Sequence, residues 1–133
     1  MSRESAPEEE TMIRFIQCVK KKPDMSVQDF RRSWKVYQTK MTDLAKAINV
    51  AGLTFCTTLN VEENLQVMMT RGTSEPFDGV AEIRISNAPR TIEALSQEPG
   101  KSLMASLQKY QTEFVDLENS SFFFAAEEVV LRR

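Results

Sequence analysis

The sequence predicts an α+β domain in which a four-stranded antiparallel sheet is covered by helices on one face. Three observations support this fold class: β-branched and aromatic runs near both ends of the chain, an alternating run after a long amphipathic helix, and a second helical stripe before the last strand. With 41% hydrophobic and 27% charged residues among 133, the composition is that of a folded chain.

The first two predicted elements are a strand and a helix. Residues 12–20 are rich in β-branched and aromatic types, and Lys-Lys-Pro-Asp after them supplies a turn. Ser26 stands three residues before Asp29, a capping-box spacing that predicts the start of a helix. The apolar residues of this helix recur at steps of three and four and define one buried stripe: Val27, Phe30, Trp34, Tyr37, Met41, Leu44 and Ile48.

Two more strands are predicted after this helix. Residues 53–61 alternate apolar and polar side chains, and residues 80–86 alternate in the same way after Asp78-Gly79. The segment between them, residues 62–76, shows no sustained period, and we interpret it as a long functional loop whose apolar centre covers a surface.

The last part of the chain predicts two helices and a closing strand. Asn87 to Pro89 predict a short helix that reaches about Gln97, and Pro99-Gly100 separate it from a longer one. The longer helix has its own stripe: Leu103, Leu107, Tyr110, Phe114 and Leu117. Residues 122–131 read as the final strand, and the resulting βαββαβ order is that of a ferredoxin-like domain with spatial strand order 4-1-3-2.

The helices of such a domain cover only one face of the sheet. Alternation assigns to the covered face Ile13, Phe15, Val19, Leu53, Phe55, Leu59, Ala81, Ile83 and Ile85. The opposite face presents Arg14, Ile16, Cys18, Thr54, Cys56, Thr58, Glu82 and Arg84. This mixture is too polar for a dry core and too apolar for solvated surface, so we expect a second copy of the chain to cover it as a homodimer.

The elements fit one domain over residues 12–133, preceded by a flexible acidic tail at residues 1–11. The tail lacks the apolar stretch of a secretory signal, and no later run approaches the ~20 apolar residues of a membrane span. Seventeen basic and 19 acidic residues leave a net charge of −2, so the charge balance favours neither nucleic acid nor a membrane as a partner.

The absence of histidine excludes several classes of chemistry. Without imidazole there is no Ser/His or Cys/His nucleophile pair and no histidine ligand for haem or zinc. Cys18 and Cys56 are too few for a disulfide framework and lack a CxxC spacing, which favours reduced thiols in the cytoplasm. We therefore expect no metal and no cofactor.

Four stretches resemble a known family: Lys21 to Trp34, Pro76 to Glu82, Glu113 to Asp116, and the Glu-Glu-Val-Val near the C-terminus. They are similar to the ethyl tert-butyl ether degradation (EthD) family of dimeric α/β-barrel proteins. The resemblance runs from about Met12 to Leu131. It implies that two protomers pack sheet against sheet and enclose a pocket for a small molecule, either between the sheets or between each sheet and its helices.

The same resemblance implies chemistry on aromatic metabolites. The superfamily includes cofactor-independent monooxygenases and enzymes that dehydrate, decarboxylate or cyclise aromatic polyketides. Where the family pattern places histidines, this chain has Gln38 and Val129. A glutamine holds a carbonyl or hydroxyl by hydrogen bonds but does not accept a proton at neutral pH.

A charged group on the uncovered face is the first candidate site. Glu82 and Arg84 lie two apart on one strand, and Arg14 shares their face on the neighbouring strand. One interpretation is a catalytic Glu82 acting as acid or base, with the two arginines binding substrate. The other is a structural ion pair that bridges sheet or dimer contacts.

The remaining candidates are substrate-binding residues on the first helix and the following loop. Tyr37 and Gln38 lie beside Trp34 and offer an aromatic face and an amide to a pocket. Packing in the core is the alternative for Tyr37, and exposure to solvent for Gln38. Met68, with Met69, forms either an adaptable lid over a hydrophobic ligand or a dimer contact.

The sequence therefore supports two hypotheses about function. The first is a homodimeric α/β barrel that binds a hydrophobic, aromatic or polyketide-like molecule and converts it without cofactor, as an oxidoreductase, monooxygenase or dehydratase. The second is a binding or assembly module that keeps the dimer and has lost the family histidines.

Overall fold

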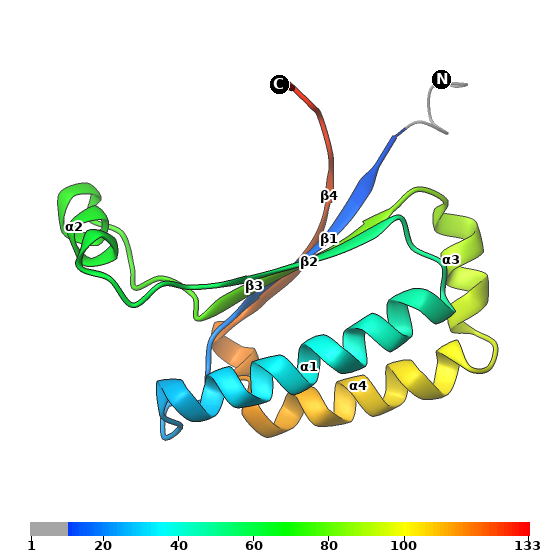
Figure 1. Cartoon of the computed structure of the whole chain (residues 1–133), viewed down its shortest axis with the longest axis horizontal. Coiled ribbons are helices and arrows are strands. Elements are labelled where there is room, and N and C mark those ends of the chain that lie inside the picture. The colour runs from blue at the N-terminus through cyan, green and yellow to red at the C-terminus, as the bar shows by residue number, and fades with distance from the viewer. Residues whose placement is uncertain (1–10) are drawn as a thin grey trace.

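A computed structural model describes residues 11–133 and shows a twisted sheet with helices packed on one face (Figure 1). The predicted tail, residues 1–11, lies outside the described residues except for Thr11. The elements in chain order are β1 (Ile13–Val19), α1 (Val27–Ala47), β2 (Gly52–Thr57), α2 (Glu62–Arg71), β3 (Gly79–Ile85), α3 (Ala88–Leu95), α4 (Gly100–Phe114), the 3₁₀ turn η2 (Leu117–Asn119) and β4 (Ser121–Ala126).

The four strands are antiparallel and lie in the order β2-β3-β1-β4, which is the predicted order. In the register, Arg14 is opposite Arg84 on β3 and opposite Ala125 on β4. Because side chains alternate along each strand, this register fixes which residues share a face. The sheet is thus the ferredoxin-like sheet that the sequence predicts.

The long helix α1 buries its predicted stripe against the sheet. The Ser26 side chain accepts a hydrogen bond from the backbone N–H of Asp29 at 3.0 Å and caps the helix. The core cluster combines α1 residues with residues of the sheet and of α4: Val19, Phe30, Trp34, Tyr37, Met41, Leu44, Ile48, Ala81, Ile83, Ile85, Leu107, Phe114 and Val115. Only Val27, at the start of the predicted stripe, is exposed.

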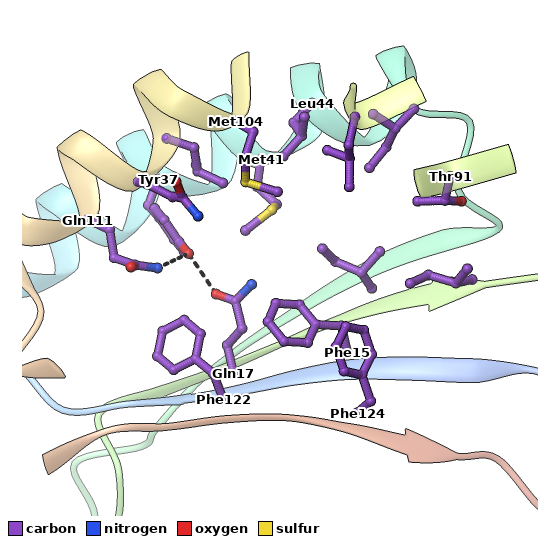
Figure 2. Close-up of a pocket in the computed structure, with 16 residues that line it drawn as sticks. Phe15, Gln17, Tyr37, Met41, Leu44, Thr91, Met104, Gln111, Phe122 and Phe124 are labelled. Carbon is purple, nitrogen blue, oxygen red and sulfur yellow. Dashed lines mark hydrogen bonds between the residues drawn. The ribbon is translucent and has the colours of Figure 1, made fainter. Parts of the chain in front are cut away.

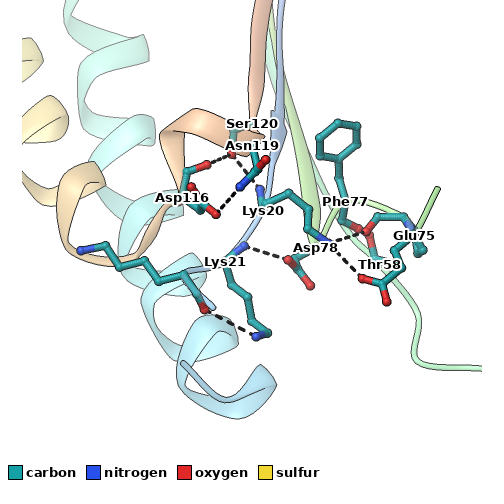
Figure 3. Close-up of polar contacts among 11 residues, drawn as sticks. Lys20, Lys21, Thr58, Glu75, Phe77, Asp78, Asp116, Asn119 and Ser120 are labelled. Carbon is teal, nitrogen blue, oxygen red and sulfur yellow. Dashed lines mark hydrogen bonds and ion pairs between the residues drawn. The ribbon is translucent and has the colours of Figure 1, made fainter. Parts of the chain in front are cut away.

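Polar contacts fix the end of β1 next to the turns that precede β3 and β4 (Figure 3). The backbone N–H of Lys21 donates to Oδ2 of Asp78 at 2.8 Å, and that of Lys20 donates to Oγ of Ser120 at 2.9 Å. The backbone N–H of Asp116 donates to the carbonyl of Lys20 at 2.8 Å. These bonds hold the three strands together at the end where α1 begins.

The structure corrects the prediction for residues 62–76. Residues 62–71 form the helix α2, which ends at Gly72 with φ of 69° in the left-handed region that favours glycine. None of the residues of α2 is buried. In Figure 1 the helix lies beyond the ends of β2 and β3, apart from α1 and α4.

Two predicted strands are longer than the observed ones. β2 ends at Thr57, and Leu59, predicted on the covered face, is 67% exposed. There the side-chain hydroxyl of Thr58 donates to the carbonyl of Phe77, and the chain leaves the sheet toward α2. β4 ends at Ala126 rather than at Leu131, and Val130 is 87% exposed.

Candidate functional site

A cavity of about 250 Å³ lies between the covered face of the sheet and the helices (Figure 2). Its lining is mostly apolar and includes Phe15, Gln17, Tyr37, Met41, Leu44, Ile48, Ile83, Ile85, Thr91, Leu95, Met104, Leu107, Gln108, Gln111, Phe122 and Phe124. These residues come from β1, β3, β4, α1, α3 and α4 together with Ile48, which follows α1. Apolar walls with a few polar groups are typical of a binding site for a small organic molecule.

The aromatic wall of the cavity consists of phenylalanines on β1 and β4, and the alternation of side chains along these strands directs them to the covered face. Phe15 and Gln17 point to the covered face of β1, and the register sets Phe124 opposite Phe15 and Phe122 opposite Gln17. The ring centroids of Phe15 and Phe124 lie 4.7 Å apart. Phe124 is 68% exposed on the edge strand β4, so the cavity reaches the protein surface beside it.

A chain of three polar side chains forms one end of the cavity. Nε2 of Gln111 donates to the Tyr37 hydroxyl at 2.9 Å, and that hydroxyl donates to Oε1 of Gln17 at 2.6 Å. Gln17 is 2% exposed and Tyr37 is fully buried. Because these groups are buried, each needs its hydrogen bonds, and the chain connects β1, α1 and α4.

All side chains that line this cavity are uncharged. Burial raises the pKa of Tyr37 to about 12, although its hydrogen bonds with Gln111 and Gln17 act in the opposite direction. The phenol therefore stays protonated at neutral pH and serves as a hydrogen-bond donor. The cavity offers neutral donors and acceptors, and none of its lining side chains accepts a proton readily near pH 7.

The opposite face of the sheet, which we call the open face, carries a charged cluster of Arg14, Glu82, Arg84 and Glu127. Arg14 forms ion pairs with Glu82 and, through Nε at 2.9 Å, with Oε1 of Glu127. Nε of Arg84 lies 3.4 Å from the same Glu127 oxygen. The hydrogen bond from Arg14 lowers the pKa of Glu127. The pKa of Arg14 is raised by its hydrogen bonds, most by the one to Glu82 and next by the one to Glu127.

The site residues predicted from sequence fall in separate places. Tyr37 lines the cavity, whereas Glu82, Arg14 and Arg84 lie together on the open face. The predicted proximity of Arg14 to Glu82 is confirmed by their ion pair. The sheet separates this cluster from Tyr37, so these residues do not form a single site in one protomer.

Three other predicted binding residues lie outside the cavity lining. Trp34 is 2% exposed in the core, and its Nε1 is buried without a hydrogen-bond partner among the described residues. Gln38 is half-buried on α1. Met68 is half-buried on α2, a helix that lies apart from α1 and α4 in Figure 1.

Three residues of these two clusters, Gln17, Gln111 and Glu127, were not predicted from the sequence pattern. Gln17 has the covered-face parity of Phe15 and Val19, and a lone amide in an apolar row was the available signal. Gln111 lies four residues after Leu107 and three before Phe114, beside the buried stripe of α4. Glu127 continues the open-face alternation of β4, but its contacts with Arg14 and Arg84 require the three-dimensional register.

Within residues 11–133, no group of three or more His, Cys, Asp or Glu side chains is placed to hold a metal ion. No helix in this range has both the length and the apolar composition needed to cross a membrane.

Comparison with protein families gives one match, to a model described as the EthD domain, over residues 22–118. This match spans well over half of the 133 residues. The chain therefore belongs to the EthD domain family, which confirms the resemblance seen in the sequence. No curated protein matches the chain.

Solved structures with a similar fold share little sequence with this chain. A dimeric ferredoxin-like protein of unknown function from Bacteroides fragilis has a TM-score of 0.59 at 11% identity, with 86% of this chain and 94% of that chain covered. Hydroxynitrile lyase from Passiflora edulis also has a TM-score of 0.59, at 8% identity, with 91% and 97% covered. A mutant of SnoaB, a cofactor-independent oxygenase from Streptomyces nogalater, has 0.53 at 10% identity, with 92% and 98% covered. These likenesses confirm the ferredoxin-like fold.

Proposed function

We propose that this EthD-domain protein is a homodimer in which each protomer binds an apolar, aromatic small molecule in the cavity between its sheet and helices. The observation that carries the proposal is a 250 Å³ cavity with mostly apolar walls and a hydrogen-bonded polar end. An aromatic body packs well against the phenylalanine rings of β1 and β4.

The open face supports the dimer. Phe123 is 43% exposed there, on the edge strand β4 and opposite Ile16 of β1. Helices cover the other face only, so a second copy would bury this mixed surface, as the sequence also predicts. The relative from Bacteroides fragilis is described as dimeric.

A cofactor-independent enzyme of the oxidoreductase, monooxygenase or dehydratase type, with Glu82 as acid or base, is the second candidate. It is favoured by the position of Glu82 and Arg14 on the face that the proposed dimer encloses. It ranks second because Arg14 already binds the Glu82 carboxylate and all side chains that line the cavity are uncharged. The geometry supports binding better than acid–base catalysis.

Binding is tested with N-phenyl-1-naphthylamine, a neutral aromatic dye whose fluorescence rises in apolar surroundings. We expect saturable binding to the wild-type protein. Met104→Trp fills the cavity from α4 with a larger side chain, and we expect it to weaken binding at least ~10-fold, which is about 1.4 kcal/mol.

The matched control is Met69→Trp, the same substitution on α2 at a side chain that is 73% exposed. It should bind the dye like the wild type. Equal dye affinity in the wild type and Met104→Trp, with both proteins folded by circular dichroism, would show that the dye binds elsewhere and would reject the cavity as the site.

A further inference from the structure

We propose that α2 of each protomer docks on residues 128–133 of a second copy of this chain, which we call the β4 extension. Two such contacts, related by the symmetry of the dimer, then close it at both ends of its sheets. This inference rests on the proposed homodimer and adds a contact between the copies that lies outside the open face.

The helix α2 exposes apolar side chains that the described part of its own chain leaves uncovered. Leu65 is 50% exposed, Val67 is 52% exposed and Met69 is 73% exposed. Leu65 and Met69 are one helical turn apart and share one side of the helix with Glu62, whereas Val67 lies on another side. A protruding helix with such side chains is typical of a contact with another chain.

The β4 extension is a second uncovered apolar segment. Val129 is 51% exposed, Val130 is 87% exposed and Leu131 is 71% exposed. The last backbone contact with the sheet is the hydrogen bond at 2.8 Å from the N–H of Glu127 to the carbonyl of Met12. The chain then continues past the sheet without forming a helix or strand up to residue 133.

The two segments lie at opposite ends of the sheet. α2 connects β2 to β3 at the end where Thr57 is opposite Gly79. The β4 extension leaves from the other end, where Ala126 is opposite Ile13. The six residues of β4, at ~3.3 Å each, separate these ends by about 20 Å. The two segments of one chain are therefore too far apart to cover each other.

Both segments flank the open face. Figure 1 shows α2 and the chain end marked C on the side of the sheet opposite to α1 and α4. A two-fold axis between two open faces, perpendicular to the strands, sets each end of one sheet over the opposite end of the other. The same rotation that buries the open faces therefore brings α2 of each copy to the β4 extension of its partner.

Charges on the two segments are complementary and similarly spaced. Glu62 and Arg71 lie at the two ends of α2, about 13 Å apart at 1.5 Å per residue. Glu128 and Arg132 are also about 13 Å apart at the rise of an extended chain, and all four side chains are exposed. An antiparallel contact therefore places Arg132 beside Glu62 and Glu128 beside Arg71, with the apolar residues of both segments between them. A parallel contact would place like charges together.

The first test compares two positions on different sides of α2. Leu65→Asp places a charge on the side that carries Met69, and we expect it to weaken the dimer about tenfold. Val67→Asp makes the matched change on the other side of the same helix and should leave the dimer within about twofold of the wild type. Sedimentation equilibrium measures both dissociation constants, and circular dichroism shows that both variants are folded.

Charge reversal tests the pairing of Glu62 with Arg132. Glu62→Arg and Arg132→Glu should each weaken the dimer about threefold at low salt, and the double variant should regain the affinity of the wild type. An effect of Glu62→Arg on the helix dipole alone would not be reversed by a substitution after β4. Additive losses in the double variant would therefore reject this pairing.

Cross-linking tests which segments of the two copies meet. Cys18 and Cys56 are first replaced by serine, and single cysteines are then introduced as Leu65→Cys in one preparation and Val130→Cys in another. On mild oxidation we expect a disulfide-linked dimer in the mixture of the two. Linked dimers in the Leu65→Cys protein alone would show that α2 meets α2 and would overturn the inference.

The outcomes separate this contact from the proposed homodimer. If the wild type is a dimer and Leu65→Asp sediments like Val67→Asp, the contact of α2 is rejected and the open-face dimer stands. If the wild type is a monomer at micromolar concentration, the proposed homodimer itself is rejected.

Discussion

The covered face of the sheet carries neutral polar groups inside an apolar cavity, whereas the open face carries four charged side chains. On the covered face, Tyr37 is fully buried and bonds to Gln17 and Gln111. On the open face, the side chains of Arg14 and Arg84 remain 32% and 35% exposed beside Glu82 and Glu127.

This difference follows from the cost of removing charge from water. A fully buried ion needs a partner and further hydrogen bonds, and an amide or phenol needs only one or two bonds. The helices remove water from the covered face within a single chain, so neutral groups are retained there. The open face keeps its charges because water, or a second copy, can complete their contacts.

The largest expected effect comes from two neighbouring phenylalanines that lie on opposite faces of β4. Phe123→Asp places a charge on the open face, and we expect it to weaken the proposed dimer at least ~100-fold, which is about 3 kcal/mol. Phe124→Asp makes the same change at the cavity entrance and should leave the dimer intact. Sedimentation velocity at micromolar concentration measures both.

These two variants test directly whether the open face, and not the covered face, forms the contact between copies. A Phe123→Asp protein that sediments as a dimer, like the wild type, would show that the open face is not the contact between copies. The charged cluster would then be an exposed feature of each protomer, with no role in assembly.

The second effect concerns the ionisation of Tyr37. Its pKa in the folded protein is about 12, compared with an ordinary value of 10.0, so the folded state holds the proton more tightly than the unfolded state. The resulting stability is fully present below pH 10 and is lost as the pH rises toward 12. The expected loss of unfolding free energy over this range is about 2 to 3 kcal/mol.

Tyr37→Phe isolates this contribution, because phenylalanine has no proton to lose. The stability difference between wild type and variant in urea unfolding should shrink between pH 10 and 12. In Tyr110→Phe the absorbance titration reports Tyr37 alone, because the chain has two tyrosines. A midpoint near 10 in that titration would mean that the covered face does not exclude water from the phenol.

The strand order and α1 could be predicted from sequence because their patterns are local. All but one of the apolar positions at steps of three and four on α1 are buried, because that stripe faces the sheet. The helix α2 could not be predicted in this way. It has no buried side, so its apolar residues follow no helical period and the segment resembles a loop.

The candidate site was predictable only in part, for a different reason. Alternation correctly separates the face of Glu82 from that of Phe15, but it does not show which helix residues meet above the sheet. The contact of Gln111 on α4 with Tyr37 on α1 joins two residues that are 74 positions apart in the chain. Such a contact depends on how α4 packs against α1, which no local pattern contains.

The smallest expected effect comes from two glycines at comparable places on the two faces. A Cβ on Gly79 would lie 2.6 Å from the buried Trp34 ring, whereas a Cβ on Gly52 would lie 3.5 Å from Cδ of Arg84, an ordinary contact. Gly79→Ala should therefore destabilise the protein by about 1 to 3 kcal/mol, since the packed core cannot move aside. Gly52→Ala should be neutral or stabilising by up to about 1 kcal/mol, because alanine loses less backbone entropy on folding. Urea unfolding of both variants measures the difference, and equal destabilisation would mean that the open face is packed as tightly as the covered face.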